Sequence, residues 1–173
     1  MKRFIIPLIA VVLFFLEPVF SLFSPIELGD VRYTLVPRFV IVYLVFIASY
    51  YDLRKSVLYG LFFGLLYDMY HIDIIGIYTF LYPLICFLAY VIIRQVHRST
   101  GTVMLLSLFM VVLLEMMSYL FASLIALTSI SFEVFMTARL VPTVIANLIF
   151  IVLFGWLFRN LIYKRVIEKQ AGM

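Results

Sequence analysis

The stretch Tyr59–Gly76, YGLFFGLLYDMYHIDIIG, departs most clearly from the otherwise apolar sequence of this chain. Its glycines, aspartates and histidine are Gly60, Gly64, Asp68, His71, Asp73 and Gly76. Glycines four residues apart lie on one face of a helix, where they let another backbone approach closely. The stretch therefore predicts a short helix that packs through its glycines and ends in a carboxylate. We expect this packing inside the protein rather than between two copies.

The composition around this stretch is that of a membrane protein. Of the 173 residues, 66% are hydrophobic and 13% are charged, so the chain lacks the polar surface of a soluble domain of this size. We expect an integral membrane protein with one transmembrane domain over residues 1–173. The net charge of +4 relates to membrane topology rather than to nucleic-acid binding. Cys86 is the single cysteine, which excludes an internal disulfide.

The hydrophobic runs predict an all-α bundle of six transmembrane helices. A helix needs roughly 17–25 apolar residues to cross the bilayer. The predicted spans are residues 4–23, 37–51, 56–68, 74–93, 102–127 and 138–158. The third is short for a full span. The first follows Met1–Arg3 as a secretory signal would, but no cleavage site of small residues follows it, so we expect an uncleaved helix.

The basic residues predict the orientation of these spans. Ten of the 13 lysines and arginines fall on the side that holds both termini. The other three, Arg32, Arg38 and Arg139, fall on the opposite side. The sequence thus predicts a multi-pass protein of the bacterial cell membrane with cytoplasmic N- and C-termini.

Five charged residues fall within the outer half of the predicted spans, on five different helices. They are Glu17, Arg38, Asp68, Glu115 and Arg139. A charge near the centre of a span costs about 2.5–3.5 kcal/mol, so each needs a partner or water. We expect an interhelical polar network, with Glu115 deepest and Arg38 or Arg139 as its cation. Alternatively, the arginines extend to the outer headgroups and Asp68 caps its own helix in interfacial water.

The remaining polar residues predict structural roles. Asn147 in the sixth span can hydrogen-bond across helices, and Gly60, Gly64 and Gly76 suit helix packing or docking. His71 is expected in a loop. The sequence contains no HExxH, GxSxG or nucleotide-binding glycine loop, and it offers no metal-ligand cluster. We therefore expect a protein that is not an enzyme and holds no cofactor or metal.

Several of these motifs, in this order, resemble one family. They are Tyr59–Asp68 followed by Gly76-Ile77-Tyr78, Met1–Phe4 with Pro7, Pro37-Arg38-Phe39, Glu115, and Arg139 with Pro142. Together they are similar to the MreD family of bacterial rod shape-determining proteins, in particular its Bacillus-like members. The resemblance extends along the whole chain.

This resemblance implies a non-enzymatic membrane scaffold of the cell-elongation machinery that helps to position peptidoglycan synthesis and so maintains rod shape. It implies direct binding to MreC and, through the complex, association with MreB, RodA and a class B penicillin-binding protein, with lipid around it. It also implies a fold similar to the S components of energy-coupling-factor transporters, with a cavity open to the outer side.

Two other functions compete with this one. The first is a small-molecule (vitamin-type) binding subunit of a transporter, whose first helix typically carries small residues for docking. Here the first span offers only Ala10 among bulky residues. The second is a lipid or proton-coupled transporter that uses Glu115 and Asp68. The sequence leaves open which helices bind a partner, the stoichiometry, and whether the cavity holds a ligand.

Overall fold

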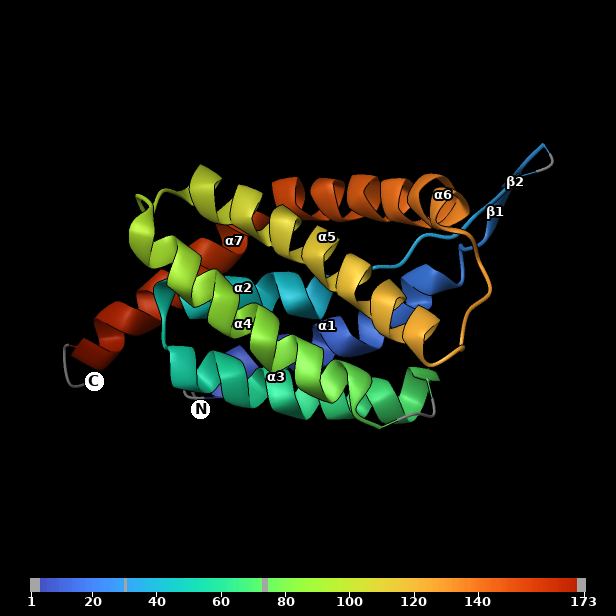
Figure 1. The fold of residues 1–173 in the computed structure, drawn as a ribbon. Coiled ribbons are helices and arrows are strands. Elements are labelled where there is room, and N and C mark those ends of the chain that lie inside the picture. Colours follow the sequence, from blue (N-terminus) through green and yellow to red (C-terminus); the bar gives the residue numbers. More distant parts are fainter. Residues whose placement is uncertain (1–3, 30, 73–74, 171–173) are drawn as a thin grey trace.

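The computed structural model describes residues 4–29, 31–72 and 75–170, most of them helical (Figure 1). Helix α1 (Ile5–Ser21) leads into an antiparallel hairpin of β1 (Ile26–Leu28) and β2 (Val31–Tyr33). The remaining elements are α2 (Phe39–Tyr50), α3 (Leu53–Tyr67), the π-helix η2 (Asp68–Ile72), α4 (Ile77–Gln95), α5 (Thr100–Leu124), α6 (Phe132–Phe135), the π-helix η3 (Met136–Leu140) and α7 (Val141–Gln170).

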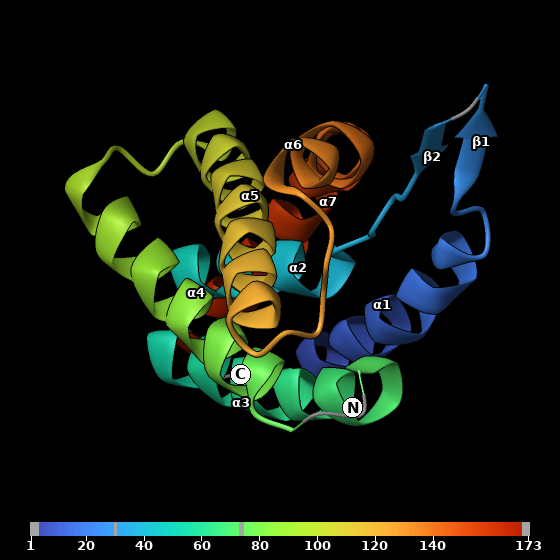
Figure 2. The same ribbon diagram turned by 45° about the vertical axis from the view of Figure 1, so that its right-hand side comes forward.

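The helices surround α2, which contacts α1, α3, α4, α5 and α7 (Figure 2). The start of α1 and the end of α7 lie at one end of the bundle, called here the terminal end. The hairpin and α6 lie at the opposite end, called here the hairpin end (Figure 1). Glu27 and Arg32 pair across the two strands of the exposed hairpin, with 2.8 Å between the guanidinium Nε and the carboxylate.

Helix α2 is buried because it is apolar on every face. Its residues FVIVYLVFIAS are all buried, and only the last, Tyr50, is half-buried. A helix without a polar face has no side to present to water, so it becomes the core. Its 12 residues cover about 18 Å, which is less than the hydrocarbon thickness. Of the predicted second span, residues 37–51, only residues 39–50 are helical, and the non-helical segment 34–38 precedes them.

The other predicted spans match helices with shifted bounds. Helix α3 begins at Leu53 rather than at residue 56, because the Asp52 carboxylate accepts a hydrogen bond from the Arg54 amide at 2.8 Å and caps the helix. The π-helix η2 then extends it, so His71 lies in a helix and not in the predicted loop. Asp73 and residue 74, the predicted start of the fourth span, lie outside the described residues.

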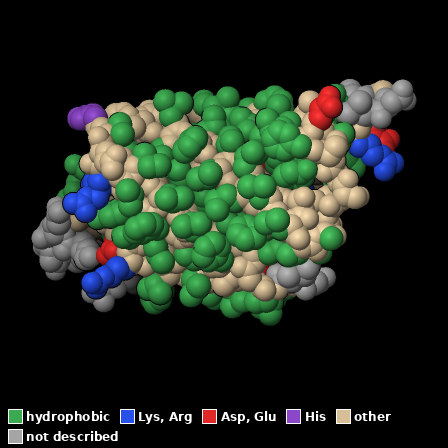
Figure 3. All heavy atoms as spheres, viewed as in Figure 1, with side chains coloured by type: hydrophobic (Ala, Val, Ile, Leu, Met, Phe, Trp, Pro, Cys, Tyr) green, Lys and Arg blue, Asp and Glu red, His purple; other side chains and the backbone are tan. Residues whose placement is uncertain are grey.

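Among the residues that the structure describes, three helical segments are long and apolar enough to cross a membrane: α4, α5 and the continuous Phe132–Glu168. Helices α1 and α2 are apolar but shorter. Large hydrophobic side chains cover the sides of the bundle, while the visible charged groups lie at its two ends (Figure 3). This distribution fits a membrane protein. The count of six spans stays a prediction.

Gly60 and Gly64 set the close packing of α3 on α4. A Cβ atom at Gly60 would lie 3.1 Å from the Pro83 nitrogen, and one at Gly64 would lie 2.3 Å from the Tyr78 carbonyl oxygen. Both glycines thus face another helix of the same chain. Gly76 is different: a Cβ there would meet open space, but its φ of +130° favours glycine at the start of α4. Its role is conformational, which corrects the expected packing role.

Candidate functional site

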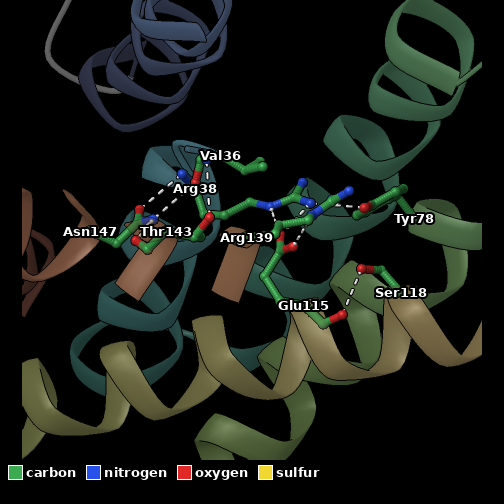
Figure 4. Close-up of polar contacts among 8 residues, drawn as sticks. All are labelled: Val36, Arg38, Tyr78, Glu115, Ser118, Arg139, Thr143 and Asn147. Carbon is green, nitrogen blue, oxygen red and sulfur yellow. Dashed lines mark hydrogen bonds and ion pairs between the residues drawn. The ribbon is translucent and has the colours of Figure 1, made fainter. Parts of the chain in front are cut away.

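A buried ionic cluster joins three elements that are far apart in the sequence. Arg38 lies just before α2, Glu115 lies on α5, and Arg139 lies on η3 (Figure 4). The Arg38 Nε and Nη2 atoms both lie 2.6 Å from the Glu115 Oε1 atom, and the Arg139 Nε atom donates to Oε2 at 3.2 Å. The side chains of Arg38 and Glu115 are 1% and 0% exposed, whereas that of Arg139 is 36% exposed. Glu115 is thus shared by two arginines.

Aromatic rings complete the environment of Arg38. Its guanidinium carbon lies 4.9 Å from the centre of the Tyr67 ring and 4.8 Å from that of Tyr78. Its Nη2 atom also donates a hydrogen bond to the Tyr78 hydroxyl at 2.8 Å (Figure 4). Cation–π contacts strengthen when they are desolvated, so the rings hold the guanidinium in place without adding charge. Buried in this way, Arg38 is too deep to extend to the headgroups.

The main chain entering α2 is also held by side chains of other helices. Asn147 of α7 accepts a hydrogen bond from the Arg38 amide at 2.9 Å and donates one to the Val36 carbonyl at 3.0 Å. Glu17 of α1 accepts one from the Val40 amide at 2.8 Å. The first amides of a helix lack partners within it, and a buried helix start needs such acceptors. Glu17 and Asn147 therefore fasten the start of α2 to α1 and α7.

Asp68 lies outside the ionic cluster, and this corrects the expected five-residue network. Its carboxylate accepts hydrogen bonds from the amides of Gly76, Tyr78 and Thr79 at 2.8–2.9 Å and from the Thr79 hydroxyl at 2.7 Å. Asp68 follows the last residue of α3, and its side chain caps the start of the next α-helix, α4. It is fully buried rather than interfacial. A carboxylate held by several N–H donors needs no arginine.

We expect Asp68→Ala to lower the free energy of unfolding by about 1–3 kcal/mol, because it leaves buried amides of α4 without acceptors. The matched control is Asp52→Ala, which removes a more exposed cap with one amide partner and should cost about 1 kcal/mol or less. SDS titration of the purified protein in mixed micelles measures both. An Asp68 variant no less stable than the Asp52 variant would contradict the capping role.

The sequence pointed to the charged residues of the site and to Asn147, but not to Tyr67, Tyr78 and Thr143. Tyr67 and Tyr78 hold the Arg38 guanidinium, and the Thr143 hydroxyl accepts a hydrogen bond from the Val36 amide at 3.1 Å. The sequence does contain one indication of the two tyrosines. Tyr67 directly precedes Asp68, and Tyr78 follows two residues after Gly76, so both belong to the motif that resembles the family. In a chain with 12 tyrosines, that indication alone does not single them out.

A cleft of about 580 Å³ at the hairpin end reaches the edge of this cluster. Arg139, Tyr78 and Ser118 line it on the side of the cluster, and Tyr119 lines it with Phe135, whose rings stack at 4.2 Å. The exposed part of Arg139 gives the cleft a cationic group beside aromatic walls. The cluster is therefore buried around Arg38 and accessible at Arg139.

Comparison with known proteins decides the family. The family model described as rod shape-determining protein MreD matches residues 2–165. The chain belongs to the MreD family. It is 30% identical to the rod shape-determining protein MreD of Bacillus subtilis (strain 168), over 86% of each chain. It is 32% identical to the cell shape-determining protein MreD of Streptococcus pneumoniae (strain ATCC BAA-255 / R6), over 73% of this chain and 77% of the relative. None of the solved structures matches it significantly.

Membership of the MreD family agrees with the apolar helices, since both indicate a membrane protein. The family is described by a role in cell shape and not by a catalysed reaction. The matched range, residues 2–165, contains the buried ionic cluster of Arg38, Glu115 and Arg139 and also Glu17. The fold likeness to transporter S components stays a prediction.

Proposed function

We propose that this MreD protein is a non-enzymatic membrane scaffold of the rod complex, formed by a single domain over residues 1–173. It binds MreC directly, associates through the complex with MreB, RodA and a class B penicillin-binding protein, and helps to position peptidoglycan synthesis. Both termini are cytoplasmic in this proposal, so the terminal end of the bundle faces the cytoplasm and the hairpin end faces outward.

The scaffold proposal is supported by the hydrogen bonds and ion pairs of the two buried carboxylates, Glu115 and Asp68. Both oxygens of Glu115 accept from arginines, and both oxygens of Asp68 accept from the start of α4. Carboxylates engaged in this way hold helices in register and are poorly placed to shuttle protons. This arrangement favours a rigid bundle that presents its surface to partners over a transporter that cycles through Glu115 and Asp68.

Depletion and crosslinking test the proposal together. Cells depleted of the protein should lose their rod shape and recover it with the wild-type gene. A photo-crosslinking amino acid placed in turn at the exposed positions Leu8, Phe87, Phe109 and Val152, each on a different helix, should capture MreC from one face of the bundle. The buried Leu81 is the matched negative control. Normal rods after full depletion, or no MreC adduct from any face, would refute it.

A second candidate, small-molecule binding, is favoured by one observation: the cleft of about 580 Å³ at the hairpin end. The first helix counts against the vitamin-type transporter subunit. Ala10, the one alanine of this helix, is fully buried against the bundle and so is not available for docking. Native mass spectrometry of the protein purified from cells distinguishes the two, because a transporter subunit would retain a stoichiometric vitamin.

A further inference from the structure

A second cleft, of about 520 Å³, lies at the terminal end of the bundle and takes no part in the buried cluster. Its walls are the last turn of α2, the start of α3, the end of α4 and the connection from α4 to α5. The side chains that matter here are Arg54 of α3, Arg98 of the connection, and the tyrosines at 51 and 90. We call it the terminal-end cleft.

The charge of this cleft is unbalanced. Arg54 and Arg98 line it, and neither forms an ion pair with any residue that the structure describes. Asp52 also lines it, but one of its oxygens caps the Arg54 amide at 2.8 Å. Lys55 and Arg94 do not line it, but they donate hydrogen bonds to the hydroxyls of two tyrosines that do, Tyr51 and Tyr90. The cleft therefore offers an anion at least two free guanidinium groups, which bind phosphate well through paired N–H donors.

Two tyrosines paired with basic side chains favour a position of the cleft at the level of lipid headgroups. The Lys55 ammonium lies 4.6 Å from the centre of the Tyr51 ring and donates to its hydroxyl at 2.8 Å. The Arg94 guanidinium carbon lies 5.6 Å from the centre of the Tyr90 ring. Tyrosines paired with basic side chains at a helix end are typical of the membrane–water interface. Phospholipid phosphates occupy the same depth.

The cleft also carries hydrogen-bond acceptors. Helix α2 ends at Tyr50, and residues 48–50 line the cleft. The last carbonyls of a helix have no amide partners within it, so they accept from donors outside. A phosphodiester carries no hydrogen-bond donor for these acceptors. A headgroup that carries hydroxyl donors next to its phosphate matches the cleft in two ways. Its phosphate can bind the two arginines, and its hydroxyls can donate to the carbonyl groups at the end of α2.

We propose that the terminal-end cleft binds the headgroup of an anionic phospholipid of the adjacent leaflet. The phosphate lies between Arg54 and Arg98, and the headgroup hydroxyls donate to the carboxyl end of α2. The lipid would fasten the α2–α3 and α4–α5 connections to the same membrane surface. This inference does not depend on the binding of MreC.

Native mass spectrometry tests the site with defined vesicles. The full chain is reconstituted into vesicles with equal amounts of phosphatidylglycerol and phosphatidylcholine, then extracted in mild detergent. We expect the wild type to retain one phosphatidylglycerol in preference to phosphatidylcholine. The R54Q/R98Q variant should retain about tenfold less, since each basic residue near an anionic lipid contributes several-fold in affinity.

The control is K164Q/R165Q, which removes the same formal charge from α7 outside the cleft, together with the Arg165–Glu168 ion pair, and should change retention less than about twofold. An equal loss in both variants would show a general charge effect and overturn the site. Excess inorganic phosphate that displaces the lipid from the wild type, with no preference for phosphatidylglycerol, would assign the cleft to a free anion instead. If R54Q/R98Q does not fold, the wild type alone decides: no preference for phosphatidylglycerol overturns the proposal.

Discussion

Replacing Glu115 by glutamine should lower the free energy of unfolding by about 3–5 kcal/mol, the range seen when one partner of a buried ion pair is removed. The physical reason is that Arg38 is fully buried and takes its counter-charge from Glu115 at 2.6 Å. The glutamine keeps the shape of the side chain, but it replaces one acceptor oxygen with an amide that can only donate. The N–H donors of this amide then face the N–H donors of Arg38 or Arg139, and no hydrogen bond can form between them. SDS titration in mixed micelles measures the loss.

The matched control is Glu133→Gln, which neutralises an exposed carboxylate at the hairpin end and should change stability by less than about 0.5 kcal/mol. A second test separates charge from shape. The double variant R38M/E115M removes both buried charges and should be more stable than either single variant, because apolar replacement of a buried pair is often neutral. Arg139 tolerates the loss of its ion pair with Glu115, since its side chain is partly exposed to solvent. An E115Q protein as stable as E133Q would contradict the cluster.

Replacing Gly64 by alanine should destabilise the bundle by about 3 kcal/mol or more, at the upper end of the cost of overpacking. The new methyl group would lie 2.3 Å from the Tyr78 carbonyl oxygen, which is backbone and cannot rotate away. Helices α3 and α4 would have to separate near the tyrosine that hydrogen-bonds Arg38. The change should therefore also weaken the buried cluster. The same SDS titration measures it, with co-purification of MreC as a second measurement.

Two glycines provide graded controls for this effect. Gly60→Ala meets the α4 backbone at 3.1–3.2 Å and should cost less, about 1 kcal/mol. Gly101→Ala meets open space on α5 and should be neutral or stabilise by up to about 1 kcal/mol, because alanine favours a helix more than glycine does. If all three variants behave alike, close contact between α3 and α4 is not what requires Gly64.

The membrane class and the helices of this protein depend on local sequence. Apolar runs reveal helices because each helix must bury its own backbone polar groups in lipid, and this depends on local sequence alone. Hence the membrane class, the helical class and most helix positions followed from the sequence. The charges at Glu115 and Arg38 stood out for the same reason: their cost in lipid does not depend on the fold.

Which groups pair was decided by tertiary structure. Glu115 is 77 residues from Arg38 and 24 from Arg139, and no local pattern brings them together. Asp68 looked like another member of the same set, yet the chain turns through Gly76 and delivers the start of α4 to its carboxylate, which satisfies it locally. Likewise, Gly60 and Gly64 indicated close packing, but only the fold shows that α4 is the partner.

The motif at Tyr59–Gly76 thus has two parts with different origins. Its glycine spacing and its terminal carboxylate are properties of the sequence, because one helical face and one helix end suffice to define them. Its role in joining α3 to α4, which brings the rings of Tyr67 and Tyr78 within 4.6 Å of each other and both against Arg38, exists only once α2 is buried between the helices. A buried guanidinium needs partners from several directions, and only a tertiary fold supplies them.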